Sequence, residues 1–301
     1  MPKILRLVVL AGGAILVFAV LGVLALWFAG GRQLDKVYTL SAETLTLPAD
    51  SASIAEGERL SILLGCNDCH GANLAGQEFI DALPFAYLPA TNLTSGDGGV
   101  GAVYSVADLE HAIRHGVDKN GRALMIMPSH EYNHFADDDV AKVIAYVQSV
   151  PPVRNTWPPR QVGFIGRLVT GMAASGLFPA AGIDHDVEHP VTVEHGVTVA
   201  YGEYLAKPCR GCHGVDFAGS VVPGAGPETP LASNLTPDSA TGLGAWSEGD
   251  FVRAMREGLR PDDTILDVAM PWRAYQLFTD DELAAMWLYL RSLEPVERST
   301  R

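Results

Sequence analysis

Basic residues are scarce in this chain of 301 residues. It has 21 Lys and Arg against 35 Asp and Glu, which gives a formal net charge of −14. Because a phosphate backbone is bound by a basic surface, this balance excludes nucleic acid as a partner. An acidic surface favours solubility, and it also suits a partner protein that presents Lys and Arg.

Cysteine is scarce as well. All four Cys lie in two identical frames, Cys66-Asn-Asp-Cys69-His70 and Cys209-Arg-Gly-Cys212-His213. No Cys remains for a disulfide framework, or for a thiol nucleophile outside these frames. The chemistry of the chain must therefore be sought in the frames themselves.

Charge is absent from one long stretch near the N-terminus. No charged residue interrupts the sequence from Leu7 to Gly31, which is long enough to cross a bilayer as a helix. The stretch is too long for the apolar part of an ordinary signal peptide. A small-x-small cleavage signal ending at Ala29 would need a small residue at position 27, where the chain has Trp27. We predict an uncleaved membrane anchor over residues 1–35. Lys and Arg flank it evenly on both sides, so charge alone leaves its orientation open.

The two Cys frames belong to an internal repeat. They lie 143 residues apart, and Met127-Pro128 corresponds to Met270-Pro271 at the same offset. The Asn92-Leu-Thr94 triplet corresponds to Asn234-Leu-Thr236 at an offset that is one residue shorter. A repeat of this length indicates a duplicated domain. The predicted domains span residues 50–153 and 196–297, with a connector over 154–195.

Both repeats are predicted to be helical. Ser105 to Asp108 and Ser247 to Asp250 each form a capping box before a helix that ends at a glycine. A final helix begins near Asp137 in the first repeat and at Thr279 in the second. No segment alternates polar and apolar residues for long enough to indicate a sheet. The expected fold is all-α, one transmembrane helix followed by two tandem helical domains.

The connector contains an apolar stretch from Gly163 to Gly182. Arg167, Pro179 and several glycines within it argue against a second membrane helix. We expect it to lie across a domain face, near the membrane.

Two thiols three residues apart, followed at once by His, are typical of haem c attachment. The thiols add to the two vinyl groups of the porphyrin, and the adjacent His becomes the proximal ligand of the iron. A zinc half-site or a redox dithiol would also use Cys-x-x-Cys, but neither explains a repeated His and a repeated downstream Met. We therefore predict two covalently attached haem c groups, bound through Cys66, Cys69, Cys209 and Cys212, with His70 and His213 on the metal.

The second axial ligand decides what each haem does. Met127 and Met270 both lie 57 residues after their own His, and both precede a proline. Met125 is the alternative in the first repeat, although its counterpart Val268 cannot ligate. His and Met together leave no open position on the iron, which favours electron transfer over oxygen or peroxide chemistry. No catalytic residue is predicted.

Several further residues are open to two interpretations. A proximal His usually donates its other N–H to a carbonyl, and the loops with Pro84 and Pro227 are candidates to supply it. The Asn-Leu-Thr triplets either bind haem propionates or shape a turn.

His111 and His115 are spaced to bind a metal on one helix face. Their repeat counterparts, Arg253 and Glu257, instead indicate a solvated face.

From Ser53 to Val296 the chain resembles the membrane-anchored dihaem cytochromes c, including the cytochrome subunits of membrane-bound periplasmic dehydrogenases. The resemblance rests on the Cys-x-x-Cys-His frames, the Asn-Leu-Thr triplets, the Met-Pro pairs and the closing helices. It implies small class I cytochrome c domains whose first and last helices cross, with Gly57 and Gly202 packed against Tyr146 and Tyr289. The chain departs from the family in two ways. The spacing from Gly57 to Cys66 is two residues longer than that from Gly202 to Cys209, and the triple-haem relatives have one more domain.

The resemblance also implies orientation and role. Haem c is attached outside the bacterial cytoplasm, so the domains would follow the anchor into the periplasm, on a single-pass inner-membrane protein. The expected partners are a dehydrogenase or quinol-oxidising complex as donor, and a cytochrome or terminal oxidase as acceptor. A fixed subunit of a larger complex would have the same haem ligands. The alternative function is a dihaem redox enzyme, a peroxidase or sulfur-compound oxidoreductase, which would need an open iron position or a thiolate ligand.

Overall fold

The computed structural model describes residues 2–41, 45–172, 174–223, 226 and 228–298. Met1 of the predicted anchor and Ala173 of the predicted connector lie outside the described residues. The described parts of Met1–Thr44, Cys69–His130 and Pro151–Asp186 form a first compact unit, and those of Leu45–Asp68, Glu131–Val150 and Val187–Arg301 form a second. The second unit therefore contains helices from both sequence repeats.

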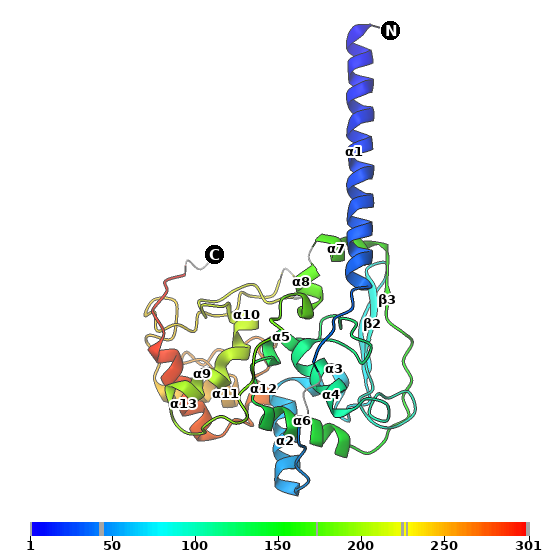
Figure 1. Cartoon of the computed structure of the whole chain (residues 1–301). Helices are drawn as coiled ribbons and strands as arrows, with labels where there is room; N and C mark the ends of the chain where they lie inside the picture. The colour runs from blue at the N-terminus through cyan, green and yellow to red at the C-terminus, as the bar shows by residue number, and fades with distance from the viewer. Residues whose placement is uncertain (1, 42–44, 173, 224–225, 227, 299–301) are drawn as a thin grey trace. The chain divides into compact units, whose positions relative to one another are not determined.

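Helices form most of the secondary structure (Figure 1). The first unit contains α1 (Lys3–Leu34), α4 (Val106–Glu110), the π-helix η1 (His111–His115), α7 (Phe164–Met172), α8 (Ala174–Leu177) and the 3₁₀ helix η2 (Pro179–Ala181). The residues of α3 (Cys66–His70) and of α5 (Ser129–Tyr132) are divided between the two units. In the second unit are α2 (Ser51–Leu63), α6 (Asp137–Ser149), α9 (Val199–Ala206), the 3₁₀ helix η3 (Lys207–Cys209), α10 (Arg210–His213), α11 (Glu248–Glu257), α12 (Trp272–Tyr275) and α13 (Asp280–Ser292).

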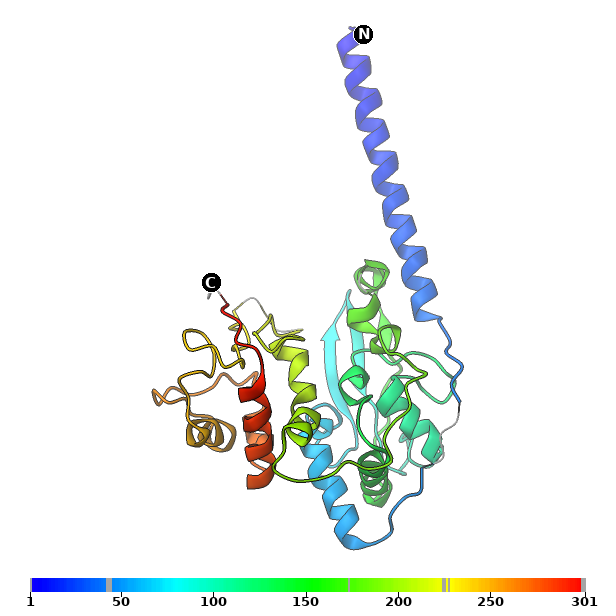
Figure 2. The same ribbon diagram turned by 60° about the vertical axis from the view of Figure 1, so that its left-hand side comes forward.

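Helix α1 contains the whole predicted apolar stretch. Among the described residues it is the one helix that is long and apolar enough to cross a membrane. Its N-terminal part extends away from the rest of the first unit, and α7 lies beside its C-terminal end (Figures 1 and 2). The apolar stretch of the connector forms α7, α8 and η2, and α7 packs against α1.

The first unit contains a small sheet, so the expectation of an all-α chain is not confirmed. Strands β1 (Gln77–Ala82), β2 (Ala86–Ala90) and β3 (Gln161–Val162) form an antiparallel sheet in the order β1-β2-β3. In β2, Ala86 and Leu88 are buried and alternate with partly exposed neighbours. This alternation lasts only five residues and includes Pro89, so the sequence resembles a loop.

The predicted helix boundaries are confirmed. Ser105, Ser247 and Thr279 each cap a helix in a complete capping box. Gly116 and Gly258 end their helices with φ of 65° and 71°, a left-handed conformation that favours glycine. The final helices α6 and α13 start at Asp137 and Asp280, as expected.

The first and last helices of each repeat cross at a glycine, as the resemblance implies. A Cβ atom at Gly57 of α2 would lie 2.0 Å from the Lys142 carbonyl oxygen and 3.1 Å from the Cβ of Tyr146 in α6. A Cβ atom at Gly202 of α9 would lie 1.9 Å from the Ala285 carbonyl oxygen and 2.9 Å from the Cβ of Tyr289 in α13. Only glycine allows this approach, and it makes each crossing a backbone-to-backbone contact.

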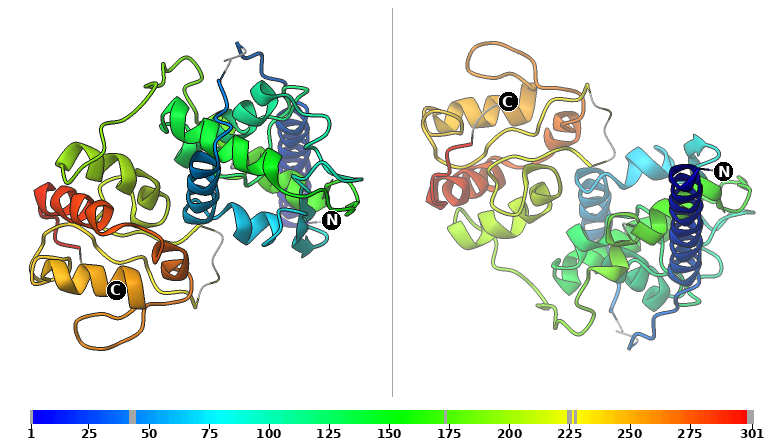
Figure 3. Two further views of the ribbon diagram at one scale, coloured as in Figure 1. Left: turned by 90° about the horizontal axis from the view of Figure 1, so that it is seen from below. Right: turned by 90° about the horizontal axis from the view of Figure 1, so that it is seen from above.

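The core of the second unit surrounds α13, which lies between α9 and α11 (Figure 3). Its fully buried members include Phe217, Leu283, Met286 and Leu290. Leu63, near the C-terminal end of α2, is part of the same core. The helix that leads into the first Cys frame is therefore anchored in the core of the second repeat.

We predict that Gly202→Ala lowers the free energy of unfolding by about 2–3 kcal/mol, because the added methyl group has to displace the α13 backbone. Urea unfolding followed by circular dichroism measures the change.

Gly249→Ala in α11 is the matched control, since its Cβ would meet no atom closer than 3.7 Å. It should leave the stability unchanged or raise it by up to about 1 kcal/mol. Equal effects of the two substitutions would contradict the close helix crossing.

Candidate functional site

A cavity in the second unit brings the second Cys frame and its downstream Met together. Its volume is about 330 Å³, inside the range of roughly 300–1,000 Å³ typical of ligand pockets. Cys209 ends η3, Cys212 and His213 lie in α10, and Met270 lies just before α12; all four line the cavity. Apolar side chains complete much of the wall, among them Leu243, Phe251, Met255, Met286 and Leu290.

The chemistry of these four residues fits a haem. The His213 Nδ1 lies 2.7 Å from the Ser233 carbonyl oxygen, so Nδ1 donates and Nε2 remains for a metal. Burial lowers the pKa of His213, which favours the neutral imidazole that ligation requires. Burial also raises the pKa of the Cys209 thiol to about 12, so the unmodified thiol is protonated at neutral pH.

The first repeat has the same local hydrogen bonds. The Nδ1 of His70 donates to the Thr91 carbonyl oxygen at 2.7 Å, and burial lowers the pKa of this imidazole too. Each carbonyl acceptor directly precedes its Asn-Leu-Thr triplet. The acceptors Thr91 and Ser233 lie at the C-terminal ends of the stretches that carry Pro84 and Pro227. The Pro84 carbonyl itself accepts from the Ile165 N–H, and Pro227 lies outside the described residues.

The Asn-Leu-Thr triplets shape turns. The side-chain oxygen of Asn92 accepts from the Thr94 N–H at 2.9 Å, and that of Asn234 accepts from the Thr236 N–H at the same distance. The side-chain amide of Asn92 donates to Val153, and that of Asn234 to Val296, both beyond the final helix of the repeat. All four side chains are buried. The triplet therefore ties the loop behind the His to the end of each repeat.

The two predicted Met ligands have equivalent backbone settings. The Met127 carbonyl accepts from the Ser129 N–H and the Met270 carbonyl from the Trp272 N–H, both at 2.8 Å. Met125, the alternative ligand, packs against the small core of the first unit around Val117 and Phe178.

Comparison with known proteins identifies the family of the chain. The cytochrome c family model matches residues 54–151 and 199–294, one match for each repeat. The chain belongs to the cytochrome c family. Its cytochrome c domains imply covalently bound haem c.

Two of three relatives of this cytochrome are named as subunits of dehydrogenases. The chain is 30% identical to the alcohol dehydrogenase (quinone), cytochrome c subunit, of Gluconobacter oxydans, over 82% of this chain and 56% of the relative. It is 32% identical to the gluconate 2-dehydrogenase cytochrome c subunit of Pantoea cypripedii, over 81% and 60%. It is 25% identical to a diheme cytochrome c-type protein of Cereibacter sphaeroides, over 81% and 86%. The chain thus spans somewhat over half the length of the first two relatives.

One interpretation of the cytochrome sequence is wrong. The helix with His111 and His115 does not present a solvated face: Glu110 and Arg114 are fully buried, and His115 is 4% exposed. The last turn is a π-helix, and the His115 Nδ1 lies 3.0 Å from the Nδ1 of His185. Among the described residues, no group of three or more His, Cys, Asp and Glu side chains is arranged to bind a metal ion. Their repeat counterparts, Arg253 and Glu257, predicted exposure wrongly because the segment that contacts His115 includes His185 and belongs to the connector, which is not repeated.

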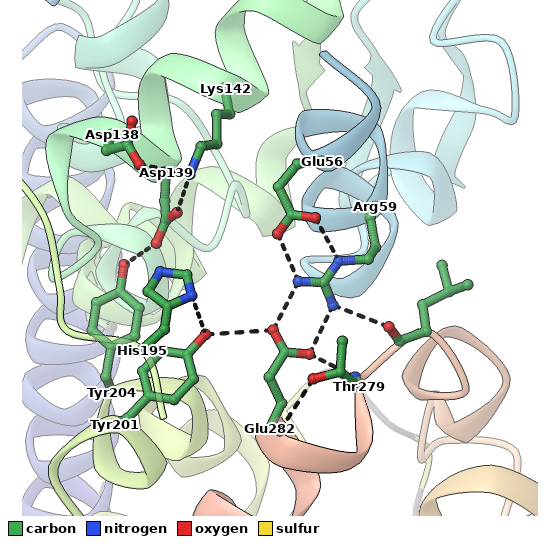
Figure 4. A network of polar contacts seen from close by, with 11 residues as sticks. Glu56, Arg59, Asp138, Asp139, Lys142, His195, Tyr201, Tyr204, Thr279 and Glu282 are labelled. Carbon is green, nitrogen blue, oxygen red and sulfur yellow. Dashed lines mark hydrogen bonds and ion pairs between the residues drawn. The ribbon is translucent and has the colours of Figure 1, made fainter. Parts of the chain in front are cut away.

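The second unit also contains a polar network between the two repeats (Figure 4). The guanidinium of Arg59 in α2 donates to both oxygens of Glu282 in α13, at 2.8 and 2.7 Å, and to both oxygens of Glu56. The hydroxyl of Tyr204 in α9 donates to Asp139 in α6 at 2.6 Å. Both acids are nearly buried, at 5% and 8% exposure.

The two contacts of the network are reciprocal. Arg59 and Tyr204 each lie two residues after the crossing glycine of their repeat, and Asp139 and Glu282 each occupy the third position of its final helix. Each repeat thus extends a side chain from its first helix to the acid of the other repeat's last helix. This self-complementary pattern is the one that isologous dimers use.

We predict that Arg59→Met lowers the free energy of unfolding by about 2–3 kcal/mol, because it leaves the buried Glu282 carboxylate without its counter-ion. Thermal unfolding by circular dichroism measures this loss.

The matched control is Arg256→Met. Arg256 also pairs with a carboxylate at 2.7 Å, but its partner Asp280 is 93% exposed, so the cost should stay below about 1 kcal/mol. Similar losses for both variants would show that burial adds nothing to the Arg59 pair.

A pH dependence follows from the same carboxylate. Burial by itself would raise the pKa of Glu282, but hydrogen bonds from Arg59 and the Thr279 N–H outweigh it, so the pKa lies below its usual value of 4.5. Because the unfolded chain then binds the proton first as the pH falls, the Glu282 contribution is complete above about pH 5.5 and is lost below pH 4.5.

The stability difference between wild type and Glu282→Gln should therefore be constant at neutral pH and shrink on acidification. Urea unfolding at a series of pH values tests this, and a difference that stays constant down to about pH 3 would contradict it.

Proposed function

We propose that this protein is a membrane-anchored dihaem cytochrome c that transfers electrons in a periplasmic respiratory chain. Its haem domains are residues 50–153 and 196–297, and helix α1 is the inner-membrane anchor with the N-terminus in the cytoplasm. The observation that carries the proposal is the convergence of Cys209, Cys212, His213 and Met270 on one apolar cavity, combined with the repeat of the same residues in the first domain.

Four residues of the chain would serve each haem. Cys66 and Cys69, or Cys209 and Cys212, would form the thioether bonds; His70 with Met127, or His213 with Met270, would hold the iron. A haem bound in this way supplies a one-electron ferric–ferrous couple with no open position. The chain's own contribution is to fix each His by its Nδ1 hydrogen bond and to exclude water from the apolar cavity. The packing of Met125 in a separate core favours Met127 as ligand.

The relatives support a dehydrogenase as electron donor, because several of them are named as cytochrome c subunits of dehydrogenases. The acceptor would be another cytochrome or a terminal oxidase. Net charge of −14 suits partners that present Lys and Arg, which would steer a transient encounter. The alternative, a dihaem peroxidase or sulfur-compound oxidoreductase, would require one iron to lack its Met ligand.

Carbon monoxide binding distinguishes these functions. We expect the purified full-length chain to contain two haems and, when reduced, to bind no carbon monoxide in difference spectra. Met127→Ala and Met270→Ala should each open one iron and bind about one equivalent of carbon monoxide per chain, because Ala cannot ligate.

Met125→Ala is the control and should behave as the wild type. Carbon monoxide binding by the wild type would overturn the carrier function, and binding by the Met125 variant in place of the Met127 variant would reassign the first ligand.

A further inference from the structure

Helix α7 is fixed against the end of α1 by glycine contacts. A Cβ atom at Gly171 would lie 2.3 Å from the Leu26 carbonyl oxygen, and one at Gly30 would lie 2.0 Å from the Arg167 carbonyl oxygen. At such separations the two backbones are in contact, as small residues allow between membrane helices. Helix α7 therefore has a defined position on the last turns of α1 (Figures 1 and 2).

Arg167, the one charged residue of α7, contacts α1. The Nε of Arg167 donates to the Trp27 carbonyl oxygen at 3.0 Å, and its guanidinium lies 4.2 Å from the centre of the Trp27 ring. The Phe164 ring lies 5.3 Å from the same indole. Arg167 thus donates to a backbone carbonyl in the last turns of α1, and the rest of α7 is uncharged.

A second face of α7 packs on the sheet. A Cβ atom at Gly166 would lie 2.1 Å from the Phe85 carbonyl oxygen, and the buried Thr170 hydroxyl donates to the Gly166 carbonyl. Apolar side chains remain on the outside of the helix. Phe164, Ile165 and Met172 are 54%, 47% and 72% exposed.

The place where α7 contacts α1 indicates the surroundings of these exposed side chains. At 1.5 Å per residue the 32 residues of α1 span about 48 Å, which exceeds the ~30 Å of a hydrocarbon core and slightly exceeds the ~45 Å of a whole bilayer. Leu26 to Gly31 are the last residues of the uncharged stretch, just before Arg32. Residues there, with Trp27 among them, lie where the acyl chains meet the headgroups.

We propose that α7 is an interfacial membrane helix that lies in the outer headgroup layer beside the anchor and buries Phe164, Ile165 and Met172 among lipids. The proposal rests on the membrane anchoring by α1 proposed above. Its consequence is that the first unit meets the bilayer at a fixed depth, through two elements rather than one tether. The uncharged outer face, continuous with the anchor, fits lipid better than water.

The test uses full-length protein in nanodiscs of phosphatidylethanolamine and phosphatidylglycerol. Single Cys are introduced at Ile165, at Leu16 in the middle of α1, and at Phe79 in β1, which is 42% exposed. The native thiols are consumed by haem attachment, so a fluorophore labels only the new Cys. Emission is compared between ordinary lipids and lipids with brominated acyl chains, and the ratio cancels quenching by haem.

We expect strong bromine quenching at position 16, at least about half of that value at position 165, and less than about a tenth at position 79. Met172→Cys is a second reporter of the same face and should match position 165. Quenching at 16 without quenching at 165 and 172 would overturn the interfacial helix and leave the anchor intact. No quenching at 16 would overturn the anchoring itself. Protection of 165 and 172 from both bromine and aqueous iodide would show that protein covers the face, which also overturns the proposal.

Discussion

The structure of the second unit depends on two buried acids at equivalent positions, Asp139 and Glu282. Each lies in the first turn of the last helix of one repeat and accepts hydrogen bonds from the first helix of the other. A buried carboxylate is unfavourable without a hydrogen-bond donor. Each acid is therefore stable only next to its donor from the other repeat, and this fixes how the helices of the two repeats pack together. This reciprocal pair explains why α2 and α6 share a compact unit with the second repeat.

The glycine crossings link this contact to the two Cys frames. Helix α2 leads within three residues to Cys66, and α9 leads within three to Cys209. Because each of these helices is fixed against its last helix by a backbone contact, the start of each Cys frame has little freedom. The Asn-Leu-Thr turns fix the carbonyl that orients each His. Such rigidity suits the proposed function, because electron transfer at an iron with two fixed axial ligands involves no ligand exchange.

The connector, which has no repeat counterpart, supplies what is particular to this chain. It provides α7 beside the anchor, the strand β3, and the segment with His185 that buries His115. In the first unit the connector therefore changes the environment of residues that look equivalent in the repeat alignment.

The sequence by itself determined the apolar helix, the repeat and the helix caps, because each depends on contacts between near neighbours or on a repeated spacing. The repeated spacing also predicted the residues that would bind haem, whereas the crossing glycines were implied by the resemblance to a known family. Only the tertiary structure decided the sheet, the burial of Glu110 and Arg114, the carbonyl partners of the proximal His residues, and the contact of Arg59 with Glu282. These depend on which distant segment covers a residue. Arg59 has the pattern of a solvated helix residue until α13 brings a carboxylate 2.7 Å from it.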